Sequence, residues 1–173
     1  MWTADKWREY TLCDASDGER LEKWGNYILR RPDPQVIWKG ERKASLWKDA
    51  DAVYTREGGG GRWTKLDVPA SWEIGYGALR FKIKPMGFKH TGLFPEQAVN
   101  WDWFSEKIRA ADRPVRVLNL FAYTGGATVA AAAAGAEVYH VDAAKNMVAL
   151  AKENAALSGL CGEKIRYYVD DCT

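Results

Sequence analysis

The stretch that decides the fold is VRVLNLFAYTGG, residues 115–126. Its first seven residues are almost continuously apolar, which is typical of a parallel strand buried on both faces of a sheet. Two adjacent glycines then mark a tight turn, and the alanine-rich residues 127–134 predict a helix. A strand, a turn and a helix in this order begin a βαβ unit, so the stretch indicates a parallel sheet.

The residues after this stretch repeat the same alternation. A second strand is expected at 137–141, a second helix at 144–157 and a third strand at 165–169. Gly135 suits the left-handed position just after the end of the first helix. We therefore expect an α/β fold with a partial Rossmann-like parallel sheet in the order β-α-β-α-β.

The first half of the chain has a different composition. Residues 1–90 hold seven of the nine tryptophans, with 17 basic and 13 acidic residues, whereas residues 91–173 are rich in alanine and carry 8 basic and 10 acidic residues. We expect a small β-rich domain over residues 1–88 and the first half of the α/β domain over residues 89–173, with Pro85 and Gly87 near the boundary. The expected strands are 7–12, 27–29, 52–55 and 79–84, with a hairpin tip at 58–61.

One further helix is expected before the quoted stretch, over residues 95–111. Its apolar face is expected to contain Val99, Trp103, Phe104 and Ile108.

The whole-chain composition excludes several classes of protein. The net charge of +2 over 173 residues does not suit a polyanion-binding tail, and no apolar run approaches the roughly 20 residues that span a bilayer. The N-terminus lacks the layout of a signal peptide. Three cysteines without a C-x-x-C pair favour a reduced, cytoplasmic setting, and no cluster of metal ligands is evident, so we expect no metal.

Three features are expected at the carboxyl ends of the strands, where ligands bind in such folds. The glycine turn 122–126 lets the backbone approach a ligand, Asp142 follows the second strand, and Asp170 and Asp171 follow the third. A carboxylate after the second strand can accept both hydroxyls of a ribose, and one after the third can accept from an adenine amine. Together they predict an adenosine-binding site, although Asp142 could instead serve the next helix and the Asp pair could be a solvated loop.

The glycine pattern bears on which adenosine ligand is bound. A dinucleotide fingerprint needs G-x-G-x-x-G, whereas residues 119–126 contain two glycines that are adjacent and late. A ligand without a pyrophosphate suits this turn better, which favours S-adenosylmethionine over NAD.

Several segments resemble a known family. Residues 117–125 are similar to motif I of bacterial class I S-adenosylmethionine-dependent methyltransferases related to the 23S ribosomal RNA cytosine-C5 methyltransferases, and residues 31–35, 91–97, 141–143 and 151–155 also resemble that group. The resemblance implies S-adenosylmethionine as cofactor, RNA as substrate with cytosine C5 as the methylated atom, and a cytoplasmic enzyme of rRNA processing.

The resemblance also implies roles for individual residues. Tyr123, Thr124 and Gly125 would line the methionine part, Asp142 would hold the ribose, and Asp171 or else Asp170 would meet the adenine amine. Asn119 stands where many class I enzymes have an acidic residue, which weakens a charged contact to the methionine ammonium. The full expected cofactor-binding set is Phe94, Gln97, Asn119, Phe121, Tyr123, Thr124, Gly125, Asp142, Ala143, Asp170 and Asp171.

The sequence departs from that family in one respect. The family continues to a fourth strand that ends in Asp-Pro-Pro, and no Asp-Pro-Pro occurs here, so we expect a chain truncated before this motif, inactive alone, with its catalytic residues beyond Thr173. Cys13, Cys161 and Cys172 are not expected to be nucleophiles. Without a fourth strand, residues 115–121 would form an open edge through which the chain could self-associate.

Three functions remain open from the sequence. The first is a methyltransferase acting on RNA, the second an NAD- or nucleotide-binding oxidoreductase domain, and the third a non-catalytic module that binds S-adenosylmethionine or RNA. Arg80, Lys82, Lys84 and Lys89 form a candidate basic patch for RNA, although these side chains could be a solvated face and the tryptophans the core of a small β domain.

Overall fold

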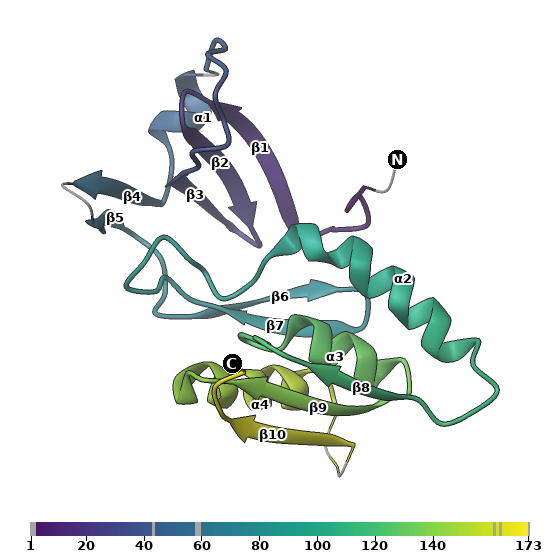
Figure 1. Ribbon diagram of the computed structural model, residues 1–173. Coiled ribbons are helices and arrows are strands. Elements are labelled where there is room, and N and C mark those ends of the chain that lie inside the picture. The colour runs from purple at the N-terminus through teal and green to yellow at the C-terminus, as the bar shows by residue number, and fades with distance from the viewer. Residues whose placement is uncertain (1–2, 43, 58–59, 161, 163, 173) are drawn as a thin grey trace. The chain divides into compact units, whose positions relative to one another are not determined.

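The computed structural model describes residues 3–42, 44–57, 60–160, 162 and 164–172, which form two compact units (Figure 1). Unit 1 contains Met1–Lys6, Gly75–Lys82 and Leu93–Thr173, and unit 2 contains Trp7–Ile74 and Ile83–Gly92. The expected boundary between residues 88 and 89 thus lies inside unit 2. Residues 75–82 go with unit 1 because the backbone N–H groups of Arg80 and Lys82 donate to Ser158 Oγ (2.9 Å) and Asn154 Oδ1 (2.8 Å).

Unit 1 is built on a parallel sheet of three strands. The strands are β8 (Arg116–Asn119), β9 (Glu137–Asp142) and β10 (Ile165–Val169), in the spatial order β10-β9-β8. Helix α3 (Gly126–Ala133) connects β8 to β9, and helix α4 (Lys145–Leu157) leads from β9 toward β10. The predicted α/β fold is confirmed. Since the strands are parallel, their carboxyl ends meet at one edge of the sheet.

The core of unit 1 depends on small side chains. Ala131 and Ala132 of α3 pack with Ala136 and Val138, all of them buried. Alanine lets a helix approach the sheet closely and costs the least conformational entropy in a helix. Gly135 adopts φ 108° just after the last turn of α3, as the sequence predicted.

The helix before the sheet confirms part of the expected apolar face, because Phe104 and Ile108 pack against the buried cluster of unit 1 whereas Trp103 is exposed. A 3₁₀ turn, η1 (Pro95–Gln97), precedes α2 (Ala98–Arg109). Trp101 is 3% exposed and its ring lies 5.3 Å from that of Phe81, whereas Trp103 is 51% exposed. The prediction of Trp103 in the buried face was therefore wrong: α2 buries Ala98, Trp101 and Ser105, which are spaced three and four residues apart.

Strand β8 is shorter and less buried than predicted. It covers four residues instead of seven, and Leu118 is 64% exposed. The prediction of burial on both faces was wrong, because Arg116 and Leu118 on one face of β8 are exposed while Val117 and Asn119 on the other are half-buried. Self-association through residues 115–121 stays a prediction.

Unit 2 contains a five-stranded sheet in the order β1-β2-β3-β4-β5. All neighbours pair antiparallel except β3 and β4, which are parallel. A short hairpin, β6 (Trp72–Tyr76) and β7 (Leu79–Ile83), follows the sheet and crosses into unit 1. The other elements are β1 (Tyr10–Ser16), β2 (Glu19–Trp24), β3 (Tyr27–Pro32), α1 (Ala44–Lys48), β4 (Ala52–Glu57) and β5 (Gly60–Leu66).

Three of the strands expected in the first half are confirmed, in β3, β4 and β7, while the first begins at Tyr10 instead of Trp7. Strands β2, β5 and β6 were missed. Of the predicted hairpin tip, Gly58 and Gly59 lie outside the described residues, and Gly60 and Gly61 begin β5.

The interior of unit 2 combines tryptophans with a buried ion pair. Trp24 is fully buried and Trp47 is 6% exposed, so these two tryptophans are core residues. Arg31, 2% exposed, donates from Nε and Nη2 to the fully buried Glu22 carboxylate at 2.7 and 2.9 Å. Tyr10 Oη also donates to Glu22, at 2.9 Å. In the described part of the chain, no helix is long and apolar enough to cross a bilayer.

Candidate functional site at the carboxyl end of the unit 1 sheet

The turn between β8 and α3 has an unusual backbone. Phe121 and Tyr123 adopt positive φ values of 50° and 52°, and Gly125 adopts 81°. A bulky residue in the left-handed region is uncommon and costs about 1 kcal/mol or more. Such conformations persist where the surroundings hold them and are concentrated at ligand sites. This turn is therefore a candidate ligand site of unit 1.

Gly125 is required by contact as well as by backbone conformation. A Cβ at this position would lie 2.8 Å from the Cβ of Ala151 and 3.6 Å from Cε1 of His140. The turn thus lies directly against α4 and β9, and no larger residue fits without displacing them.

Asp142, at the end of β9, fixes this turn through its carboxylate. Its Oδ2 accepts the N–H of Tyr123 at 2.8 Å and its Oδ1 accepts the N–H of Ala144 at 2.9 Å. The N-cap residue of α4 is Ala144, and no side chain caps this helix. Of the alternative that Asp142 serves the next helix, the structure retains only its bond to the Ala144 N–H. An ionised carboxylate has about four acceptor sites, so two remain for further donors.

A cavity of about 320 Å³ lies beside the turn. This volume falls at the lower end of the range of small-molecule sites. The rings of Phe94 and Tyr123 approach to 5.3 Å between centroids at the cavity wall. The lining residues are Leu93, Phe94, Gln97, Asn100, Trp101, Phe104, Asn119, Phe121, Ala122, Tyr123, Thr124, Gly126 and Ala127.

A buried chain of hydrogen bonds orients one lining residue. Asn119 donates from Nδ2 to Thr128 Oγ1 (2.9 Å), and Thr128 Oγ1 lies 2.9 Å from His140 Nδ1. Thr128 Oγ1 accepts from Asn119, and its bond to His140 Nδ1 takes its direction from the tautomer of the histidine. Because the Asn119 amide nitrogen is bonded to Thr128, the carbonyl oxygen of the same amide is left as an acceptor for a ligand in the cavity.

His140 is a neutral structural group in this chain. It is fully buried, and burial lowers its pKa to about 4 although the nearby Asp142 charge opposes this shift. Its Nε2 is buried without a hydrogen-bond partner among the described residues. The histidine is therefore uncharged near neutral pH and acts by positioning Thr128.

The structure brings together six of the expected site residues in the cavity: Phe94, Gln97, Asn119, Phe121, Tyr123 and Thr124. Gly125 belongs to the adjoining turn. Asp142, Ala143, Asp170 and Asp171 do not line the cavity, although the Tyr123 bond links Asp142 to its wall. Asp170 and Asp171 are exposed, and the Asp170 N–H donates to the Asp142 carbonyl at 3.3 Å, so the tips of β9 and β10 are adjacent.

Sequence reasoning found Gln97 but missed the rest of one side of the cavity. Asn100, Trp101 and Phe104 also line it, and they lie three, four and seven residues after Gln97, which is the spacing of one helical face. This period was readable from the sequence once the start of α2 was known. Within the described ranges, no group of three His, Cys, Asp or Glu side chains could hold a metal ion.

Known proteins are similar to this chain in sequence. The protein family described as "S-adenosylmethionine-dependent methyltransferase" matches residues 51–170. The chain is 38% identical over 120 residues to "Ribosomal RNA large subunit methyltransferase K/L" of Shewanella frigidimarina, and 41% identical over 98 residues to the protein of the same name from Shewanella baltica. These matches cover 68% and 56% of this chain but 16% and 13% of those proteins.

Solved structures show the same fold. A SAM-dependent methyltransferase from Agrobacterium tumefaciens matches with a TM-score of 0.89 at 41% identity, over 95% of this chain and 53% of that one. Trm5 from Methanocaldococcus jannaschii, solved in complex with adenosine, matches in fold with a TM-score of 0.58 at 15% identity, over 83% of this chain and 45% of that one. The chain therefore spans about half the length of the Agrobacterium tumefaciens methyltransferase and a much smaller part of the Shewanella relatives.

Proposed function

The chain belongs to the family of S-adenosylmethionine-dependent methyltransferases, and on this premise we propose that it forms the cofactor-binding part of an enzyme that methylates ribosomal RNA. The observation that carries the proposal is the cavity beside the strained turn, which Asn119 lines and whose wall at Tyr123 is bonded to Asp142 at the end of β9. The names of the Shewanella relatives support RNA as the substrate. Cytosine C5 as the acceptor rests on the resemblance of residues 117–125, and of the four other segments quoted above, to that family.

The residues of the cavity suit the cofactor. Its walls are aromatic at Phe94 and Tyr123, and Asn119 offers a neutral amide oxygen to the methionine ammonium. Asp142 has two acceptor sites left for ribose hydroxyls after its two backbone bonds. Asp171, or else Asp170, is assigned to the adenine amine.

The chemistry demanded of this part of the chain is positioning. S-adenosylmethionine supplies a methyl group already activated on a sulfonium, so the protein contributes binding and orientation. The left-handed turn holds the backbone of Tyr123 against Asp142, and the Asn119–Thr128–His140 chain fixes the amide at the other side. We assign no acceptor-activating residue within the described part, and we expect the chain alone to bind cofactor without turnover.

Calorimetry with S-adenosylhomocysteine tests the proposal. Asp142→Ala should weaken binding by roughly ten- to 100-fold, because it removes hydrogen bonds worth about 1–3 kcal/mol each when a buried partner is left unsatisfied. Asp112→Ala, which changes an exposed loop carboxylate in unit 1, is the matched control and should leave the affinity unchanged.

Three results would count against the proposal. Unchanged affinity in Asp142→Ala would refute the role of that carboxylate. Binding of NAD in place of S-adenosylhomocysteine would favour the oxidoreductase alternative. Binding of S-adenosylhomocysteine by a whole protein that transfers no labelled methyl group to ribosomal RNA would favour the non-catalytic module.

A further inference from the structure

We propose that unit 2 carries a binding site for an unpaired RNA nucleotide, formed around the exposed ring of Phe88. The inference rests on the proposed function, because it takes RNA as the substrate. A hollow of about 510 Å³ is lined by Tyr54, Arg56, Phe88, Lys89 and His90 together with three glycines. All these residues belong to unit 2. The hollow shares no lining residue with the cavity in unit 1.

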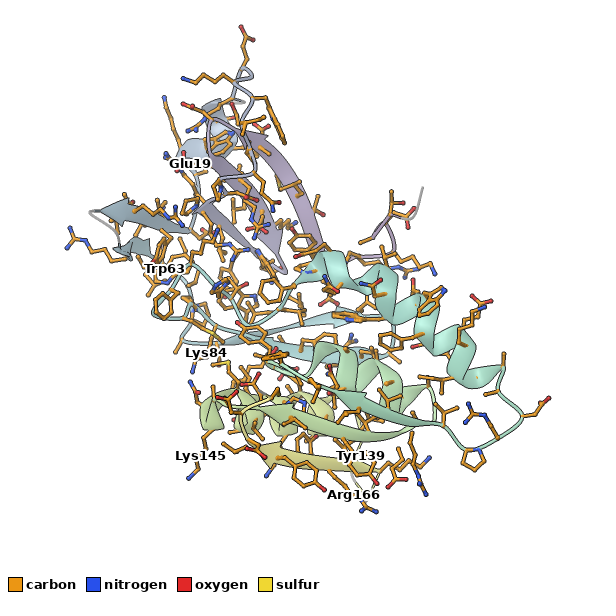
Figure 2. The ribbon with its side chains drawn as sticks, viewed as in Figure 1. Glu19, Trp63, Lys84, Tyr139, Lys145 and Arg166 are labelled. Atoms are coloured by element: carbon orange, nitrogen blue, oxygen red, sulfur yellow. The ribbon has the colours of Figure 1, made fainter. Side chains whose placement is uncertain are left out.

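The loop that carries Phe88 is a fixed hairpin. The Lys84 N–H donates to the Thr91 carbonyl and the Met86 N–H to the His90 carbonyl, both at 3.1 Å. Trp63, on β5 (Figure 2), donates from Nε1 to the Met86 carbonyl at 2.8 Å. The hairpin is therefore held at its base and along one side.

Phe88 nevertheless remains 75% exposed at the tip of this hairpin. An exposed aromatic ring contributes little to the stability of its own unit. Held by a hairpin with several anchors, it is a preformed surface for a planar apolar group. Unpaired bases stack on aromatic side chains in this way, and such stacking tolerates any base.

The buried ion pair supports the same hairpin. While its other nitrogens bind Glu22, Arg31 donates from Nη1 to the Lys89 carbonyl at 2.6 Å. Lys89 in turn donates from Nζ to the Pro32 carbonyl at 3.0 Å. A buried ion pair is a costly way to gain stability, but a bidentate arginine with a third bond fixes a backbone position well. Here that position is the residue next to Phe88.

The surroundings of the hollow are electropositive. The positive charges near Lys89 and His90 are those of Arg20, Arg31 and Arg56, and the facing carboxylates are Glu22 and Asp33. Burial, and after it the neighbouring cations, lower the pKa of His90. Arg56 and Lys89 thus flank an aromatic platform with cationic groups suited to a phosphate, which is the arrangement that binds single-stranded nucleic acid.

Fluorescence anisotropy with a labelled oligouridylate of about 12 nucleotides tests the site, since single-stranded sites cover about 4–16 nucleotides. Phe88→Ala should weaken binding roughly tenfold or more, and Arg56→Gln should also weaken it. Phe88→Tyr should restore most of the affinity, because it keeps the ring. Ile37→Ala and Lys39→Gln make matched changes at exposed residues of unit 2 outside the hollow and should leave the affinity unchanged.

The outcomes separate the site from the proposed function. If the unaltered chain binds the oligonucleotide and Phe88→Ala binds it equally well, the site is refuted while RNA remains the substrate. If the unaltered chain binds S-adenosylhomocysteine but no oligonucleotide, both the site and the RNA assignment fail. A 4-thiouridine version of the oligonucleotide should crosslink within residues 84–91, and crosslinks confined to other segments would overturn the site without any variant.

Discussion

The two units bury polar groups in opposite ways. Unit 1 buries a neutral chain of Asn119, Thr128 and His140 behind its cavity, whereas unit 2 buries a charged pair, Glu22 and Arg31. A neutral chain can aim an amide at a ligand without adding a charge to the site. A charged pair can hold a backbone carbonyl firmly, as Arg31 holds that of Lys89, but removing either partner leaves the other charge buried without its partner. Both arrangements position a group: the neutral one positions the Asn119 amide at the cavity, and the charged one positions the backbone at Lys89.

Substitution in the buried Glu22–Arg31 pair should cause the largest loss of stability. Arg31→Met removes the bidentate partner of the buried Glu22 carboxylate, which keeps only its 3.4 Å contact with Arg20, and removing one partner of such a pair costs about 3–5 kcal/mol. Urea unfolding followed by tryptophan fluorescence, which reports on Trp24 in the core of unit 2, measures the loss.

The double variant Glu22→Gln/Arg31→Met should lose less than the sum of the two single variants, because the buried carboxylate is removed together with its bidentate partner. Glu153→Gln, which breaks an exposed 2.8 Å bond to Lys82, serves as control and should change stability by less than about 0.5 kcal/mol. Equal losses in Arg31→Met and Glu153→Gln would show that burial of the pair does not matter.

In unit 1 the largest effect is expected at the turn. Gly125→Ala should destabilise unit 1 by about 2–4 kcal/mol, since it combines a left-handed residue, about 1–2 kcal/mol, with a 2.8 Å contact to Ala151 that the packed core must absorb. Affinity for S-adenosylhomocysteine should fall with it, because the turn forms the cavity wall.

Gly159→Ala separates the two causes. Gly159 has a similar φ of 71° but nothing within 4 Å of an added Cβ, so its loss should be confined to the backbone cost. If the two variants lose the same stability, the contact with α4 contributes nothing.

Local pattern predicted the α/β unit well. The strand, glycine turn and alanine helix of residues 115–134 are specified by neighbouring residues, and the structure contains them with small shifts in their ends. Unit 2 was harder because the polar sequence of β2, Glu19–Trp24, shows no apolar alternation, and its strand is stabilised by the pairing of Glu22 with Arg31 of the neighbouring strand β3. Such an ion pair does not appear in the hydrophobic periodicity from which strands are predicted.

The site shows the same division. Asn119, Tyr123 and Thr124 follow one strand and were predictable from position alone. The helical wall of the cavity at Trp101 was not, because the 3₁₀ turn before α2 decides which face is buried. The positioning role of His140 was likewise invisible, since only the fold brings it to Thr128.

The neutral hydrogen-bonded residues of unit 1, Asn119, Thr128 and His140, should affect how stability depends on pH. His140 has a pKa of about 4 when folded and about 6.5 when unfolded. Between these values the unfolded chain binds a proton that the folded chain does not, so the free energy of unfolding decreases as the pH falls from 6.5 toward 4, by at most about 1.4 kcal/mol per pH unit.

Unfolding free energies at pH 7 and pH 5 measure this effect. Asparagine places an amide group roughly where the histidine has Nδ1, and this amide can donate or accept, so His140→Asn keeps a partner for Thr128 while removing the titration. The fall between pH 7 and pH 5 should therefore be smaller in His140→Asn than in the unaltered chain, and it should be reduced less in His90→Asn, whose half-buried histidine also has a lowered pKa. A His140 ring that titrates near pH 6.5 by NMR would mean that water reaches the hydrogen bonds from Asn119 through Thr128 to His140. The proposal that a neutral His140 positions the Asn119 amide would then be wrong.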